Sequence, residues 1–183
     1  MQFIYQTERL ELRILSSDYA SLVRDFYLKN RDFLKPFEPK RPENFFSIGF
    51  QQNNLYGEYK AFLKLNHIRF WLFRRNDPSV IIGSACFSNI VRGAFQKCMV
   101  GYKLDQLHCH QGYMTEALSF LVPMVARELK LHRVEAFVQP NNESSVALLS
   151  RLHFKEEGYL SSFAEINGKW TDHLLFSYFP DEN

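Results

Sequence analysis

The pattern of apolar residues changes near residue 68, and this change constrains the fold more than any other feature of the chain. Residues 68–73, 80–90 and 96–104 are apolar runs separated by short turns such as Asn76-Asp77-Pro78, which predicts three antiparallel strands. Helical and extended patterns then alternate. We expect a helix over 112–129 kinked at Pro123, a strand over 133–138, a helix over 142–152, and a hairpin of strands 159–165 and 170–179 through Asn167-Gly168.

The first third of the chain is mainly helical. Residues 9–14 alternate with period two and predict a strand, after which residues 16–18 provide N-cap residues for a helix ending near Asn30. Two prolines predict a loop over 34–39, and a second helix is expected over about 42–66. The resulting order, β-α-α-β-β-β-α-β-α-β-β, predicts an α+β fold with a central sheet.

Length and charge narrow the class of protein. A chain of 183 residues is typical of one domain, which we assign to residues 1–183. The net charge is only +2, from 22 Lys and Arg against 20 Asp and Glu. Such a small charge does not favour a protein that binds nucleic acids or membrane surfaces. Three cysteines, an odd and sparse set, are typical of reduced thiols. Charges are interleaved through residues 1–14, and no apolar run reaches about 18 residues, so we expect a cytoplasmic protein.

Two polar segments stand at strand-to-helix junctions. Residues 104–117 run through a polar loop containing Gly112 into a helix, whose N-terminal N–H groups favour phosphate oxygens. Residues 138–145 form the second junction, where Asn141 or Asn142 could cap the helix. Turn formation and capping alone would explain each segment. Together, however, the two junctions would open side by side at one edge of the sheet, where open α/β sheets bind ligands.

A series of motifs in fixed order spans nearly the whole chain. The motifs are TERLELR at 7–13, NRDFLKP at 30–36, IGS at 82–84, GYKL at 101–104, GYMTEA at 112–117, HRVEA at 132–136 and WTDH at 170–173. In this order they resemble the GNAT N-acetyltransferases, and within them the Rim-type ribosomal-protein-alanine N-acetyltransferases. The resemblance implies a splayed mixed sheet with helices on both faces, acetyl-CoA as cofactor, and direct transfer of the acetyl group to a primary amine.

The resemblance also implies which residues bind the cofactor. The family's [QR]-x-x-G-x-[GA] loop falls on Cys109, His110, Gln111, Gly112, Tyr113 and Met114. Gly112 matches this pattern, whereas Cys109 and Met114 depart from it, although backbone N–H groups bind phosphate without those side chains. Tyr102, Lys103 and Leu104 match the strand that pairs with the pantetheine arm. Asn142 and Ser145 match the N-x-x-[AS] of the following helix.

The usual catalytic side chains of the family are missing. Met99 stands where many members have a glutamate base, and Leu149 stands where many have a tyrosine acid. Ser145 is then the candidate proton donor to the departing thiolate, unless it only bonds the helix backbone. Glu165, Asp172 or a water could relay the amine proton.

The missing base bears on the acceptor. An α-amine (pKa about 7.7–8.0) is neutral roughly hundreds of times more often at pH 7 than a lysine amine (about 10.4), so the site favours a protein N-terminus. The Rim-type resemblance implies, more narrowly, that the acceptor is the N-terminal α-amine of a ribosomal protein, with alanine or serine first. Residues 33–38 border the acceptor entrance in this fold, which makes Phe33, Leu34 and Phe37 the candidate contacts.

Several alternatives stay open at this point. The chain could acetylate a small-molecule amine such as an antibiotic or polyamine, or bind acetyl-CoA without catalysis, and it could be a monomer or a homodimer. We expect no metal site, because adjacent loop residues such as His108, Cys109 and His110 rarely surround one ion. Cys109, beside a helix N-terminus, is expected to have a lowered pKa and to be the first thiol that iodoacetamide labels. His153, in place of the family's glycine, is expected to end a helix at positive φ.

Overall fold

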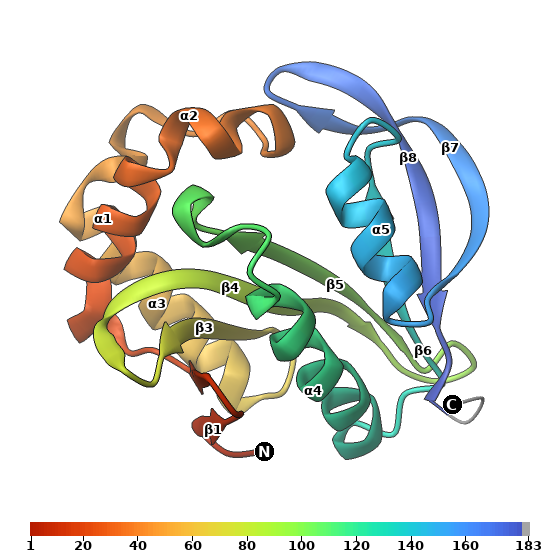
Figure 1. Ribbon diagram of the computed structural model, residues 1–183, viewed down its shortest axis with the longest axis horizontal. Helices are drawn as coiled ribbons and strands as arrows, with labels where there is room; N and C mark the ends of the chain where they lie inside the picture. Colours follow the sequence, from red (N-terminus) through yellow and green to blue (C-terminus); the bar gives the residue numbers. More distant parts are fainter. Residues whose placement is uncertain (181–183) are drawn as a thin grey trace.

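The computed structural model describes residues 1–180, whose strands form one eight-stranded sheet (Figure 1). The strands are β1 (Ile4–Gln6), β2 (Leu10–Arg13), β3 (Ile68–Arg74), β4 (Asp77–Val91), β5 (Lys97–Leu104), β6 (Arg133–Val138), β7 (Lys155–Ile166) and β8 (Lys169–Tyr178). Their order in the sheet is β1-β2-β3-β4-β5-β6-β8-β7. Strands β5 and β6 pair in parallel, and the other neighbours are antiparallel. The predicted mixed central sheet is confirmed.

Helices cover both faces of this sheet (Figure 1). They are α1 (Ala20–Lys29), α2 (Arg31–Leu34), α3 (Ile48–Leu63), α4 (Tyr113–Glu128) and α5 (Glu143–Arg151), with short 3-10 turns η1 (Ser17–Tyr19), η2 (Lys35–Phe37), η3 (Glu43–Phe46) and η4 (Gln106–His108). In Figure 1, α4 and α5 lie in front of the sheet and α3 lies behind it. Within the described residues, none of the helices has the length and apolarity that crossing a bilayer requires.

Strand β3 has apolar side chains on both faces of the sheet, so both faces must be packed against helices. Its residues Ile68, Phe70 and Leu72 belong to the core cluster that includes the apolar stripe of α4. The intervening Trp71 and Phe73 belong to a second cluster with α1 and α3. Side chains of a strand alternate between faces, so a strand buried on both sides reads as a continuous apolar run.

Local signals explain where the elements begin and end. Asn167 and Gly168 both have positive φ, so the predicted hairpin turn is confirmed. His153 has a φ of 62°, and the Phe154 N–H donates to the Leu149 carbonyl at 3.0 Å, so the predicted left-handed helix end is also confirmed. Helix α4 continues through Pro123 without ending there.

Other boundaries differ from the predictions. The predicted loop over 34–39 contains the end of α2 and the 3-10 turn η2, because Pro36 lies in the first turn, where no N–H is needed. Helix α3 begins at Ile48 instead of residue 42, because the Ser47 hydroxyl accepts from the Phe50 N–H at 3.2 Å and caps it. Residues 16–18 lead into the 3-10 turn η1, and α1 itself starts at Ala20.

The sheet also contains residues that the sequence did not predict to be in strands. Strand β1 is only three residues long, too short for a detectable alternation, and β4 begins at Asp77, inside the predicted turn. Strand β7 begins at Lys155 instead of Tyr159, since its first residues are largely exposed and lack an apolar pattern.

Candidate active site

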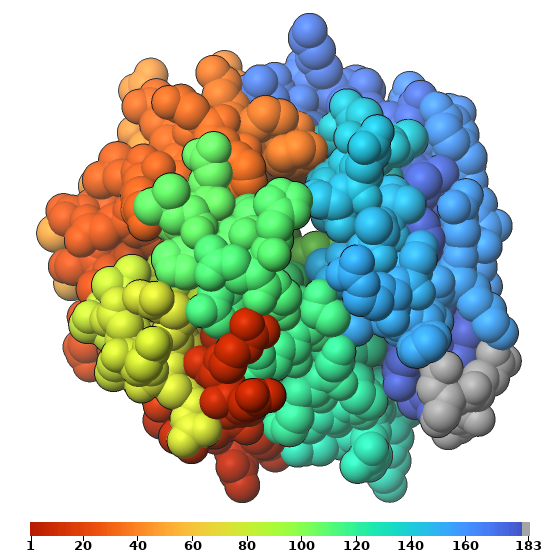
Figure 2. Space-filling view, viewed as in Figure 1, coloured from red at the N-terminus to blue at the C-terminus, as the bar shows by residue number. Residues whose placement is uncertain are grey.

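The main cleft forms where β5 and β6 separate. Residues 97–99 of β5 pair with residues 133–135 of β6, and beyond them β5 pairs with β4 while β6 pairs with β8. The edge of β5 that faces β6 over residues 100–104 is therefore open. The cleft has a volume of about 1140 Å³, and Figure 2 shows its mouth as a hollow between α5 and the segment leading into α4.

A loop with left-handed backbone precedes α4 at one wall of the cleft. Gly112 caps the helix with φ 79° and ψ 1°, and the first helical bond runs from the Glu116 N–H to the Gly112 carbonyl at 2.9 Å. The N–H groups of residues 113–115 are thus free of helical partners, as at any helix start. Arg9 fixes the loop: it donates to the Gln111 carbonyl at 2.9 Å and to the Glu116 carboxylate at 2.6 Å. This helix start carries the free N–H groups and partial positive charge that favour an anion.

Asp105 anchors the base of this loop. Its side chain is 1% exposed and accepts from Lys29 at 2.8 Å, from the Asn30 amide at 3.0 Å and from the Leu107 N–H at 2.9 Å, with His108 Nδ1 at 2.9 Å. Burial alone would raise the pKa of Asp105, but the hydrogen bonds from Lys29, Asn30 and His108 lower it to about 2. The ionised carboxylate therefore ties the loop to the end of α1.

The opposite wall is the start of α5. The Asn142 side chain accepts from the Ser145 N–H at 3.3 Å, so Asn142 is the helix cap, one of the two residues predicted for this role. Beside this turn of α5, the buried Tyr102 hydroxyl makes no hydrogen bond among the described residues. Burial raises the pKa of Tyr102 to about 12, against the opposing effect of the neighbouring Ser145 hydroxyl.

These features fit a long, phosphate-bearing cofactor. The loop before α4 offers N–H groups to a diphosphate, the open edge of β5 offers backbone groups to an extended arm, and the orphaned Tyr102 hydroxyl requires a polar partner in the cleft. We call this side, formed by the loop before α4 and the start of α5, the cofactor half.

On the other face of the sheet, the cleft is lined by residues 33–41 and by β3 and β4. We call this side the acceptor half. Glu38 accepts hydrogen bonds from Lys103 and Arg41. Burial alone would raise the pKa of Glu38, but Lys103 and then Arg41 lower it below its ordinary value. The segment also bridges to the far side of the cleft, since the Glu38 carbonyl accepts from the Asn167 N–H at 2.9 Å and the Pro36 carbonyl from Gln139 Nε2 at 3.2 Å.

The structure brings nearly all of the sequence-predicted site residues to this one cleft. The residues that line it are Phe33, Leu34, Phe37, Tyr102, Lys103, Leu104, Cys109, His110, Gly112, Tyr113, Met114, Asn142 and Ser145. Gln111 does not line it, because its side chain turns back to donate to the Leu107 carbonyl at 2.8 Å. Lys103 is divided between the halves: its backbone lies on β5 and its ammonium group pairs with Glu38.

The structure corrects the expectation for Cys109. Burial and the charge of Asp105 raise the pKa of Cys109, and its thiol donates to the Asp105 carbonyl at 3.5 Å. The effect expected from the nearby helix N-terminus is therefore outweighed, first by burial of the thiol and then by the charge of Asp105. Leu149, at the usual position of the family's acid, is fully buried in the core.

Sequence reasoning missed a group of side chains in the acceptor half. His67 and Cys86 line the cleft beside Arg69, and Glu58 of α3 pairs with Arg69 at 2.8 Å. One local signal pointed to this face, because Ser84, Cys86 and Ser88 alternate along β4 with the apolar Ala85 and Phe87. The partners from α3 and β3 had no local signal.

Comparison with known proteins agrees with this architecture. The family model described as "Acetyltransferase (GNAT) domain" matches residues 9–155. The "[Ribosomal protein uS5]-alanine N-acetyltransferase" of Escherichia coli K12 is 38% identical over 170 residues, which is 92% of this chain and 87% of that protein. The ribosomal-protein-S5-alanine acetyltransferase of Vibrio fischeri has a crystal structure with a TM-score of 0.93 at 30% identity, covering 99% and 98% of the two chains.

A further solved structure contains a CoA compound. It is Mycobacterium smegmatis RimJ in complex with CoA-disulfide, with a TM-score of 0.87, 25% identity, and coverage of 94% of this chain and 83% of that one. The fold and cleft thus define an acyltransferase that takes its acyl group from a thioester of coenzyme A. The chain belongs to the GNAT family and is an acetyl-CoA-dependent N-acetyltransferase.

Proposed function

We propose that this enzyme acetylates the N-terminal α-amine of a ribosomal protein, with alanine or serine as the first residue. The observation that carries the proposal is the 38% identity, over 92% of the chain, to an enzyme named for the alanine of ribosomal protein uS5. A ribosomal acceptor also supports the cytoplasmic location expected from the sequence.

The cofactor half would bind acetyl-CoA mainly through its backbone. The N–H groups of Tyr113, Met114 and Thr115 would hold the diphosphate, and residues 102–104 of β5 would pair with the pantetheine arm, with Asn142 facing it. Acetyl-CoA supplies the activated thioester. The open edge of β5 would hold the arm of the cofactor next to the acceptor half, so the transfer would take place between positioned groups.

Ser145 is the proposed proton donor to the departing thiolate. Its hydroxyl lies beside that of Tyr102, and both line the cleft. With its pKa raised by burial to about 12, Tyr102 keeps its proton at neutral pH and leaves Ser145 as the donor. Neither Leu149, which is fully buried, nor the thioether of Met99 can take this role.

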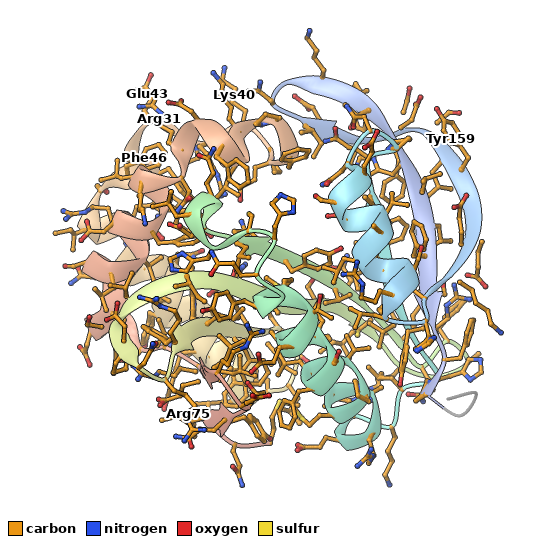
Figure 3. All side chains as sticks on the ribbon, viewed as in Figure 1. Arg31, Lys40, Glu43, Phe46, Arg75 and Tyr159 are labelled. Atoms are coloured by element: carbon orange, nitrogen blue, oxygen red, sulfur yellow. The ribbon has the colours of Figure 1, made fainter. Side chains whose placement is uncertain are left out.

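The charges of the acceptor half favour a neutral amine. Glu38 is paired with Lys103 and Arg41, and Glu58 with Arg69, so neither carboxylate is free to recognise a polycation. A smaller hollow of about 420 Å³ adjoins this half and shares Glu38 and Arg41 with it. Its rim includes Arg31, Lys40, Glu43 and Phe46, labelled in Figure 3. It offers room for the residues that follow the acceptor's N-terminus.

A peptide panel with acetyl-CoA, read by mass spectrometry, tests the proposal. The panel carries free N-terminal Ala, Ser, Met or Lys, N-blocked peptides with an internal lysine, and small amines. We expect acetylation confined to free α-amines, with Ala or Ser preferred. Acetylation of small amines alone would overturn the proposal in favour of a small-molecule enzyme. Acetyl-CoA binding without any product would favour a non-catalytic binding protein.

A further inference from the structure

Cys86 and His67 form a close pair in the acceptor half. The Sγ atom of Cys86 lies 3.3 Å from Nε2 of His67. Cys86 is 8% exposed and borders the cleft. It lies on β4, opposite Gly101 of β5. A Cβ atom built on Gly101 would meet no atom within 4 Å, so the space over this strand position is open.

A carboxylate supports the imidazole. His67 Nε2 lies 3.7 Å from the Glu58 carboxylate, which Arg69 Nε holds in place at 2.8 Å. The hydrogen bonds to Cys86 and then to Glu58 raise the pKa of His67 to about 9. An imidazole in this position is placed to take the thiol proton as the sulfur attacks, with the Glu58 carboxylate close enough to stabilise the resulting cation. The thiolate, and not the thiol, is the nucleophile of cysteine chemistry.

The other two cysteines lack this arrangement. Cys98 is fully buried, and burial raises its pKa to about 12. Cys109 has a raised pKa and donates its proton to a backbone carbonyl. The acetyl transfer proposed above uses none of the three thiols, so the Cys86–His67 pair is free for another reaction.

We propose that Cys86 is a reactive thiol that exchanges with small disulfides entering the acceptor half, and that the mixed disulfide blocks this half. The thiolate attacks one sulfur of the disulfide, a Cys86–sulfur bond forms, and the original S–S bond breaks. The leaving thiolate takes the proton from the His67 imidazolium. The small disulfide is the oxidant, and a free thiol reverses the step. Only the expected loss of activity rests on the proposed function.

The first experiment uses 4,4′-dithiodipyridine on the full chain, with thiopyridone release followed by absorbance and the modified cysteine located by peptide mapping. We expect a fast phase of one equivalent on Cys86, ahead of Cys98 and Cys109. In His67→Gln this phase slows by on the order of tenfold, since no imidazole is left beside Sγ to take the thiol proton. The surface variant His132→Gln is the matched control and keeps the wild-type rate.

Mapping on the wild-type protein decides the site without any variant. A fast phase on Cys109 or Cys98, or an unchanged Cys86 rate in His67→Gln, would overturn the proposal. The singly modified protein should still bind coenzyme A by calorimetry, lose peptide acetylation, and regain it with dithiothreitol. Loss of coenzyme A binding on modification would contradict the placement of Cys86 in the acceptor half. If the protein acetylates no peptide at all, the proposed acceptor fails while the thiol result stands.

Discussion

The cofactor half of the cleft presents mainly backbone groups, whereas the acceptor half presents side chains. The former depends on the left-handed Gly112, the first turn of α4 and the open edge of β5. The latter is assembled from charged and polar side chains that reach in from four elements. A backbone site tolerates side-chain changes, which explains how Cys109 and Met114 can replace the family's usual residues.

The largest expected effect tests whether the cofactor half needs any side chain for catalysis. Ser145→Ala should lower kcat by on the order of 10²-fold, because general acid catalysis supplies about that much, with little change in the Kd for acetyl-CoA. Steady-state kinetics and calorimetry measure the two values. Ser150→Ala on the same helix, where the hydroxyl only bonds the Val146 carbonyl, should have wild-type kinetics. Equal activity of both variants would remove Ser145 from the mechanism.

Asp105 tests whether the backbone site depends on one buried charge. Its pKa in the folded protein, about 2, is lower than the ordinary 3.8, so it stabilises the fold above about pH 4. This contribution, about 2 kcal/mol, is lost as the pH falls from 3.8 towards 2. Urea unfolding of Asp105→Asn should show that deficit at pH 7 and a smaller one near pH 3. The exposed Asp32→Asn is the control, and a deficit independent of pH would contradict the role of the charge.

Gly112→Ala tests the backbone geometry itself. A non-glycine residue at φ 79° costs roughly 1–2 kcal/mol, and the new Cβ would lie 3.3 Å from the Arg9 guanidinium. Acetyl-CoA should bind about tenfold more weakly by calorimetry. Gly57→Ala in α3, where a Cβ meets nothing within 4 Å, should bind it normally. Unchanged affinity in Gly112→Ala would mean that the loop does not hold the diphosphate.

The smallest expected effect is that of Glu38→Gln, and it tests whether the acceptor half acts independently of the cofactor half. Glu38→Gln leaves Lys103 and Arg41 without their carboxylate, so the KM for the acceptor peptide should rise several-fold while acetyl-CoA affinity stays the same. Glu156→Gln, an exposed residue of β7 that lines neither the cleft nor the smaller hollow, is the control. A matching loss of acetyl-CoA affinity would show that the halves are not independent.

The same division explains what the sequence could predict. Gly112, Asn142 and the Asn167-Gly168 turn act through neighbouring residues, so their roles follow from local spacing. The pairing of Glu58 with Arg69 depends on how α3 packs against the sheet, and no local pattern encodes it. Cys109 was misjudged for the same reason, because its thiol environment depends on the buried Asp105. Helices α1 and α3 begin later than the sequence predicted, because a 3-10 turn precedes each of them. Local capping signals do not distinguish a 3-10 turn from the first turn of an α-helix.

The three-residue seam between β5 and β6 has a consequence for the lifetime of the protein. Among the described strands it is the one parallel pairing, and it joins the sheet's two parts, β1–β5 and β6–β8. A ligand that binds in the cleft and contacts both β5 and α5 adds interactions between these two parts of the sheet. Saturation at a hundred times Kd adds about 2.7 kcal/mol to the free energy of unfolding. Cells rich in acetyl-CoA should therefore hold a more durable enzyme than starved cells.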